Sequence, residues 1–239
     1  MEIQKLNQKT YEYVFDYFST KIISGELKLN DKIPPEREIA EDLGVSRNSV
    51  REVMHMLEIT GLIECIQGSG NYVRCNPQDY MMKSVHMVMS LLKINYIEIF
   101  HIRCAYEYAA LELAMEMATD EEIEKLHQIV NKMAEPLSIK ESADYDAKFH
   151  NALVKASHNR LLILYTSMIS DLMDQFIVNL RTKILEDKRR AELLQNTHWT
   201  MYEALVKKDF YAGRKAMERH FEIVGEQLAK MEKRMKDAQ

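Results

Sequence analysis

Residues 27–63 have the sequence LKLNDKIPPEREIAEDLGVSRNSVREVMHMLEITGLI, and this stretch decides the fold of the first part of the chain. Pro35 sits just inside a predicted helix, where its fixed φ is tolerated, and this helix is short because Gly44 ends it. Ser46 is a residue type that caps helix N-termini, so a further helix is expected directly after it. Two short helices joined by a glycine-containing turn are typical of a helix-turn-helix.

The helix predicted after Ser46 has two different faces. Its apolar residues recur at helical spacing and predict a buried stripe of Val50, Val53, Met54 and Leu57. The opposite face carries Arg47, Asn48, Arg51 and His55, and the segment from Val45 to Arg51 holds two arginines and no acid. A recognition helix needs such side chains near its N-terminus, because arginine and asparagine reach base edges and phosphates.

The flanking segments complete a small domain. Upstream, apolar residues at helical spacing predict an amphipathic helix that Gly25 ends: Tyr11, Val14, Phe15, Phe18 and Ile22. Downstream, LIECI and NYV flank QGSG, which predicts a two-stranded hairpin with a glycine-rich turn. The sequence therefore predicts an N-terminal winged helix-turn-helix domain of three helices plus a β-hairpin wing.

Composition limits the class of protein. The chain has 239 residues and a formal net charge of −5, so DNA binding would have to rest on a local basic patch. Its three cysteines, Cys65, Cys75 and Cys104, show no CxxC spacing and indicate a reducing, cytoplasmic environment. The N-terminus has no apolar segment typical of a signal peptide, and no apolar run is long enough to span a bilayer, so no membrane partner is expected.

The rest of the chain is predicted to be helical throughout. Prolines and glycines are concentrated early in the chain, which places the winged domain at residues 1–75, a linker at 76–79 and a second domain at 80–239. Apolar periodicity in the second domain predicts an all-α antiparallel bundle of six or seven helices, one of which opens with a capping box at Thr119–Glu122. The expected fold class is mainly α.

One group of residues in the second domain could bind a metal ion. Asp146 and His150 are four residues apart, so a helix places both on one face, and His198 and His220 lie on two later amphipathic helices. Three imidazoles and one carboxylate would suit Zn²⁺, Ni²⁺ or Mn²⁺ if the helices converge in the bundle interior. The alternative is that each is an ordinary surface or core residue, since helical histidines and Asp–His neighbours are common.

The first domain resembles the GntR family of bacterial regulators in its ordered series PPEREIA, GVSRNSVRE, LEITGLI and GSGNYV. This resemblance implies a list of DNA-contacting positions: Arg37, Arg47 and Arg51, with Ser46, Asn48 and Ser49 around them and Gly68 at the wing tip. Asn30 stands where the family usually has glycine, but asparagine tolerates left-handed conformations, so the turn is expected to persist. Gln67 is a second departure, in the wing.

The second domain is similar to the FCD ligand-binding domain of the FadR subfamily, through FHIR with Glu107, then ATDEEIEKL, DAKFHNALVKASHN, NTHWTMYEAL and MERHF. This resemblance implies that the metal ligands are Asp146, His150, His198 and His220. It also implies that Arg103 faces an effector pocket, whereas the alternative for Arg103 is a surface salt bridge to Glu107 one turn away. The family more commonly has other residues at three positions: His101, His158 and Thr197.

Together these patterns predict a DNA-binding transcriptional regulator. A small carboxylate bound at the metal would control the affinity of a homodimer for a palindromic double-stranded operator. Two alternatives stay open: a regulator that responds to the metal itself, and a metal-dependent hydrolase. No enzymatic activity is expected, because the sequence shows no further acid or base beside the four predicted ligands.

Overall fold

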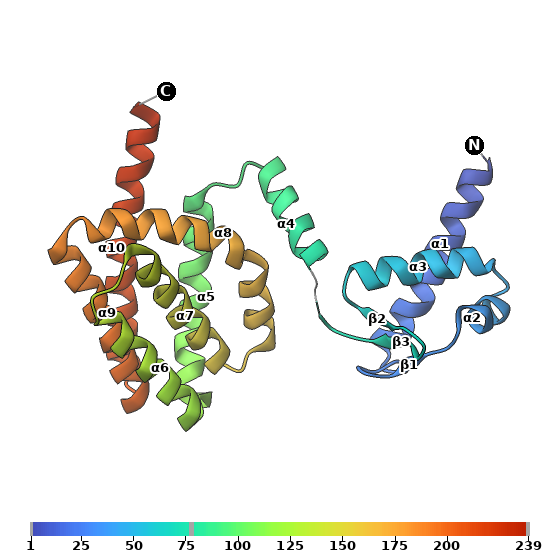
Figure 1. Cartoon of the computed structure of the whole chain (residues 1–239), viewed down its shortest axis with the longest axis horizontal. Coiled ribbons are helices and arrows are strands. Elements are labelled where there is room, and N and C mark those ends of the chain that lie inside the picture. Colours follow the sequence, from blue (N-terminus) through green and yellow to red (C-terminus); the bar gives the residue numbers. More distant parts are fainter. Residues whose placement is uncertain (1, 77–78, 238–239) are drawn as a thin grey trace. The chain divides into compact units, whose positions relative to one another are not determined.

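The computed structural model describes the backbone of residues 2–76 and 79–237, and the side chains of residues 10–76, 83–167, 177–178 and 180–234. The chain forms two compact units, Met1–Val88 and Met89–Gln239 (Figure 1). The predicted linker at 76–79 includes residues 77 and 78, which lie outside the described residues.

The first unit contains the predicted helix-turn-helix. Its helices are α1 (Glu2–Ile23), α2 (Glu36–Leu43) and α3 (Arg47–Ile59). Ser46 caps α3, since its Oγ accepts a hydrogen bond of 3.1 Å from the backbone N–H of Ser49. Gly44 ends α2 in a left-handed conformation with φ +64°, and α2 is therefore short, as predicted. Pro35 occupies the capping position directly before α2 and not, as predicted, its first turn.

A three-stranded antiparallel sheet closes the first unit. The predicted hairpin is β2 (Ile63–Ile66) and β3 (Gly70–Val73), and β1 (Lys32–Ile33) adds a strand on the other edge of β3 that the sequence did not predict. Asn30 leads into β1 with φ +74°, so the turn persists without glycine. The core beneath the sheet and helices is apolar and includes Val14, Phe18, Ile39, Val50 and Val53.

The second unit is the predicted helical bundle. Helix α4 (Asp79–Leu91) spans the boundary between the units, and the bundle itself consists of α5 (Tyr96–Met117), α6 (Asp120–Met133), α7 (Ile139–Ala156), α8 (Arg160–Leu185), α9 (Lys188–Lys207) and α10 (Phe210–Asp237). From α7 onward each helix packs against the one before it, whereas α5 packs against α7 and α10. Capping boxes at Asn95, Thr119 and Ser138 fix the starts of α5, α6 and α7.

The interior of the bundle is mostly apolar, with side chains such as Leu111, Phe149, Leu153 and Met201 fully enclosed. It also contains an unusual number of buried polar and charged side chains, contributed by α5, α7, α8, α9 and α10. Because burying a charge without a partner is costly, this polar centre needs a specific explanation. Within the described part of the chain, none of the helices is both long and apolar enough to cross a membrane.

Candidate functional site

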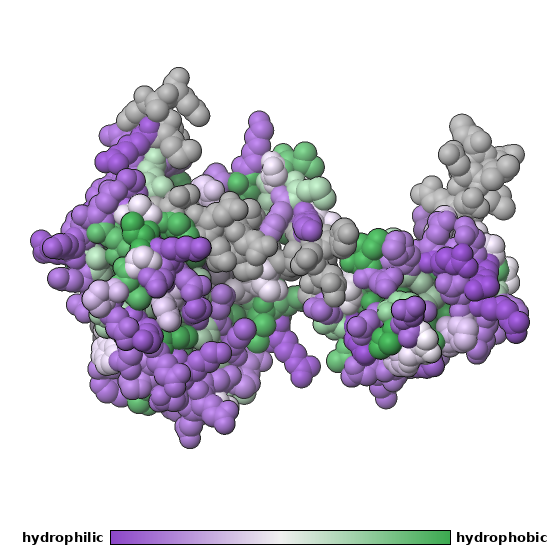
Figure 2. Space-filling view, viewed as in Figure 1, coloured by the Kyte–Doolittle hydropathy of each residue, from purple (hydrophilic) through white to green (hydrophobic). Residues whose placement is uncertain are grey.

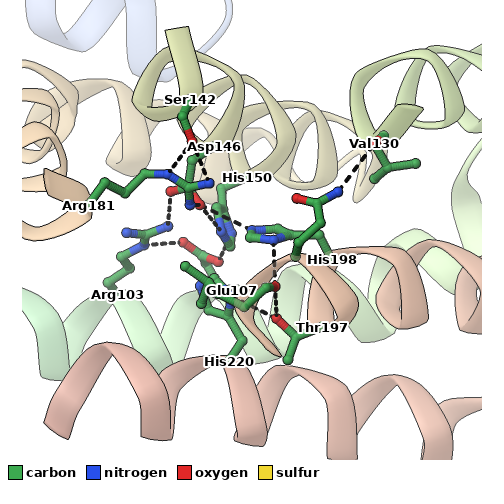
Figure 3. A network of polar contacts seen from close by, with 12 residues as sticks. Arg103, Glu107, Val130, Ser142, Asp146, His150, Arg181, Thr197, His198 and His220 are labelled. Carbon is green, nitrogen blue, oxygen red and sulfur yellow. Dashed lines mark hydrogen bonds and ion pairs between the residues drawn. The ribbon is translucent and has the colours of Figure 1, made fainter. Parts of the chain in front are cut away.

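The four residues predicted to bind a metal converge in the polar centre (Figure 3). Asp146 and His150 come from α7, His198 from α9 and His220 from α10, and none is more than 4% exposed. One potential ligand atom from each residue lies within 4.8 Å of the others. Ligand atoms on opposite sides of a single zinc-sized ion are about 4.2 Å apart, so this spacing is close to what one ion requires.

The hydrogen bonds that Nδ1 of His198 and Nδ1 of His220 form determine which ring nitrogens could bind a metal ion. Nδ1 of His198 lies 3.0 Å from the carbonyl oxygen of Leu194, so this nitrogen carries the proton and donates it. The hydroxyl of Thr197 donates to the same carbonyl at 2.6 Å, and it therefore accepts from Nδ1 of His220 at 3.2 Å. Both imidazoles are left with an unprotonated Nε2, and neither Nε2 has a hydrogen-bond partner among the described residues.

Burial keeps these imidazoles neutral. It lowers the pKa of His198 to about 4, although the neighbouring Asp146 acts in the opposite direction, and it lowers the pKa of His220 well below the usual range. Nε2 of His198 nevertheless lies only 3.1 Å from Oδ1 of Asp146. An unprotonated nitrogen and a carboxylate oxygen at this distance need a cation between them. The residues present therefore fit a divalent transition metal ion.

A second layer of charged residues surrounds the four. Burial alone would raise the pKa of Asp146, but the Arg181 guanidinium holds it well below its usual range. Nη1 of Arg181 donates to Asp146 Oδ1 at 2.5 Å, while its Nε and Nη2 donate to the hydroxyl of Ser142 at 3.1 and 3.0 Å. Sequence analysis missed Arg181 and Ser142. The available signal was an arginine within the apolar sequence of α8.

Glu107 of α5 also lies in this layer, where its Oε2 contacts Nδ1 of His150. Burial would raise the pKa of Glu107, but Arg103 and His150 lower it below the usual value, so it is a carboxylate. The expectation that no further acid lies beside the ligands is thus wrong. The sequence could not show this contact, because Glu107 and His150 are on different helices.

Arg103 pairs with Glu107, with Nε donating to Oε1 at 2.6 Å, but both side chains are buried, so the pair is not the surface salt bridge given as the alternative. Burial opposes the charge of Arg103, whereas Glu107 and Asp146 raise its pKa, so it remains a guanidinium. Its Nη2 lies 3.9 Å from Asp146 Oδ2 and has no hydrogen-bond acceptor among the described residues. A charged donor is thus left over beside the four converging residues.

The predicted DNA-contacting arginines are exposed on the first unit, over a surface that is mainly hydrophilic (Figure 2). The side chains of Arg47 and Arg51 are 62% and 55% exposed, and both Nε atoms donate to Oε2 of Glu36, at 3.2 and 3.3 Å. Arg37 pairs with Glu41 at 3.3 Å, also on the surface. Exposed pairs of this kind are weak, so these guanidiniums can exchange a carboxylate for a phosphate.

The remaining predicted DNA contacts lie around these arginines. Ser46 and Ser49 share a hydrogen bond of 2.8 Å between their hydroxyls at the start of α3, and Asn48 donates to Glu52 at 3.0 Å. Gly68 lies in the turn between β2 and β3 with φ +76°, and a Cβ atom there would meet open space. The left-handed backbone, and not crowding, favours glycine at this wing position.

Two family profiles match the chain. Residues 10–73 match bacterial regulatory proteins of the gntR family, and residues 98–223, more than half of the chain, match the FCD domain. The chain belongs to the GntR family. This regulator is 33% identical to the Uxu operon regulator of Haemophilus influenzae over 231 residues, which cover 93% of this chain and 83% of the relative. It is 31% identical to the Uxu operon transcriptional regulator of Escherichia coli, covering 92% and 87% of the two chains.

A solved structure supports the fold of this GntR regulator. The Streptococcus agalactiae GntR structure is similar with a TM-score of 0.62 at 24% identity, covering 90% of this chain and 98% of that one. The predicted combination of a GntR helix-turn-helix with an FCD domain is thereby confirmed, and the protein is a DNA-binding transcriptional regulator. Its relatives are named as regulators of operons, and the family is one of regulators and not of enzymes.

Proposed function

We propose that this regulator changes its affinity for an operator when a small organic acid binds beside a divalent transition metal ion in the second unit. The observation that carries this proposal is the buried Nη2 of Arg103, a charged donor without an acceptor among the residues that the structure describes, next to the four converging side chains that could hold a metal ion. A carboxylate is the ligand that would satisfy it, because guanidinium groups bind carboxylates through charge-assisted hydrogen bonds.

The ion would be held by Asp146, His150, His198 and His220. When bound, it would supply positive charge and open coordination positions for a carboxylate oxygen. The chain's own residues prepare this arrangement: Leu194 and Thr197 fix the protons of two imidazoles on Nδ1, and Arg181 keeps Asp146 ionised. The donor set suits zinc, nickel or manganese.

The effector would have to be small, since the polar centre is enclosed by the five helices that contribute to it. Arg103 would keep Glu107 as the internal partner of its Nε and would use Nη2 for the effector. This division of donors favours regulation by an organic acid over regulation by metal alone, because a metal sensor has no use for a guanidinium nitrogen that lacks an acceptor among the described residues.

DNA binding would require two copies. A single α3 reaches only a few base pairs, so specific operators are recognised by dimers at palindromic sites. The second unit also exposes apolar side chains on adjoining helices, including Ile102 of α5 and Leu161 and Tyr165 of α8, which a second copy would cover. We place this homodimer in the cytoplasm, where bacterial operators are found.

The metal part of the proposal is tested by elemental analysis of purified protein. One transition metal ion per chain is expected, with its content reduced in His198→Ala and His220→Ala. His101→Ala is the matched control, because His101 is exposed on α5. If both variants of the bundle histidines retained full metal content, the site would lie elsewhere and the effector proposal would fall with it.

The effector part is tested by measuring operator affinity with metal alone, with a panel of organic acids alone, and with both together. A response that needs both supports the proposal, and a full response to metal alone supports the metal-sensing alternative. Turnover of an acid by the metal-loaded protein would instead indicate a hydrolase.

A further inference from the structure

A groove lies between α6 and α7 on the surface of the second unit, away from the polar centre. Its volume is about 790 Å³, and its lining includes Lys125, Lys132, Lys148, Lys155, Ile129 and Tyr145. None of its lining residues belongs to the buried cluster of histidines, arginines and carboxylates. The surface around α6 is largely hydrophilic (Figure 2).

The four lysines surround the groove in pairs. Lys125 and Lys132 are seven residues apart on α6, and Lys148 and Lys155 are seven apart on α7. Seven residues correspond to about 10.5 Å along a helix and return the side chain to nearly the same face. Because α6 and α7 run antiparallel, Lys125 faces the end of α7 that carries Lys155, and Lys132 faces the part that carries Lys148.

The groove is positively charged although the whole chain has a net charge of −5. Glu135 is the one acid among its lining residues, and it pairs with Lys132 at 3.0 Å. Lys148 pairs with Asp144, which lies outside the groove lining, and its Nζ is 4.6 Å from the centre of the Tyr145 ring. Lys125 and Lys155 form no ion pair or hydrogen bond with any side chain that the structure describes.

We propose that this groove binds a small molecule carrying two or more phosphate groups. Four ammonium groups spread over about 10 Å are too widely spaced for one carboxylate, but they match several phosphates of one ligand. The volume lies within the range of about 300–1,000 Å³ that small-molecule sites occupy. The floor is partly apolar, with Ile129, Ala152 and the Tyr145 ring, so it can also pack against a carbon skeleton or a flat ring.

Concavity favours a small ligand over duplex DNA as the occupant. The phosphates of a duplex lie on a convex cylinder and are contacted by side chains that project from a ridge or helix, as on α3 of the first unit. Lysines that line both walls of a groove instead enclose a compact anion.

The experiment is a calorimetric titration of the full-length protein with inorganic tripolyphosphate, compared with orthophosphate. Tripolyphosphate is expected to bind more tightly, and the Lys125→Gln/Lys155→Gln variant is expected to bind it about tenfold less tightly, because two uncompensated charges are lost. Lys140→Gln/Lys188→Gln is the matched control, since it removes two exposed lysines from helix starts outside the groove and should bind like wild type.

Two further arms make the result specific. The titration is repeated with His198→Ala, because tripolyphosphate could remove metal from the histidine cluster and this could be mistaken for binding in the groove. His198→Ala is expected to bind tripolyphosphate as tightly as wild type does. This result does not depend on the proposed metal function. Equal weakening in both lysine variants, or no binding to wild type, would overturn the proposal. So would a groove variant that loses affinity for random-sequence duplex DNA in parallel, because the occupant would then be nucleic acid.

Discussion

Thr197 offers the sharpest test of how the buried centre is organised. Thr197 stands where the family more commonly has another residue, and its hydroxyl lies between the Leu194 carbonyl and Nδ1 of His220. The side chain is buried, with 6% exposed. Replacing it with valine keeps the shape but removes the only acceptor for the His220 proton among the described residues.

Two effects of Thr197→Val can be estimated. Leaving a buried donor without an acceptor costs about 1–3 kcal/mol of stability. Losing an outer hydrogen bond to a metal-bound histidine typically lowers metal affinity about 10–100-fold. The second effect arises because the His220 proton is no longer held on Nδ1 and can move to Nε2, which then cannot bind a metal. His198 keeps its own hydrogen bond to the Leu194 carbonyl, so the substitution affects only one of the proposed histidine ligands, His220.

The assay is a zinc titration against a chromophoric chelator, with urea unfolding of the metal-free protein as the second measurement. Thr197→Ser is the matched control, because it retains the hydroxyl and loses only a methyl group. We expect Thr197→Ser to bind zinc nearly like wild type and Thr197→Val to bind it much more weakly. If the folded valine variant bound zinc as tightly as the serine variant, the proton assignment on His220 would be refuted.

Three further predictions concern the two arginine sites. Arg47→Ala or Arg51→Ala should each weaken specific operator binding about 5–150-fold in a gel-shift titration while the fold persists, since a bidentate base contact contributes about 1–3 kcal/mol of discrimination; wild-type affinity in both variants would contradict the recognition-helix assignment. Operator affinity should fall steeply with salt despite the negative net charge, because local arginines displace counterions from phosphates, and a flat plot of log affinity against log salt would exclude this. Arg103→Lys should retain full metal content but bind carboxylates about tenfold more weakly, since lysine lacks the planar fork; unchanged acid affinity in calorimetry would remove Arg103 from the effector site.

The fold of the first unit could be predicted well because its signals are local. Turn glycines, the cap at Ser46 and the apolar spacing of α3 each act within a few residues. The strand β1 could not be predicted, since two residues are too short to show alternation and pair only through a distant partner, Lys32 opposite Tyr72. The His158 departure also has a local explanation: its φ is +51°, a conformation that favours the glycine more common in the family.

The buried centre was only partly predictable for a related reason. A spacing of four residues places Asp146 beside His150, but it does not say which face of the helix points inward. For Arg103 and Glu107 the same spacing left a surface pair open as the alternative, yet the pair is buried because α5 is surrounded by other helices. The apolar sequence around Arg181 indicates burial, but its partner could not be assigned, because Asp146 lies 35 residues away in the sequence and on another helix.

Charge balance in this centre links the proposed metal to the proposed acid. Arg103, Arg181, Glu107 and Asp146 lie buried together, and their formal charges cancel. A divalent ion adds two positive charges where uncompensated charge is costly, and a carboxylate bound at Arg103 offsets part of them. Metal should therefore favour acid, and by linkage acid must raise metal affinity by the same factor. Because Arg103 is on α5, Asp146 on α7 and Arg181 on α8, a ligand that rebalanced these charges would act on three helices at once, and the proposed effector would thereby have a physical means of changing how the second unit packs.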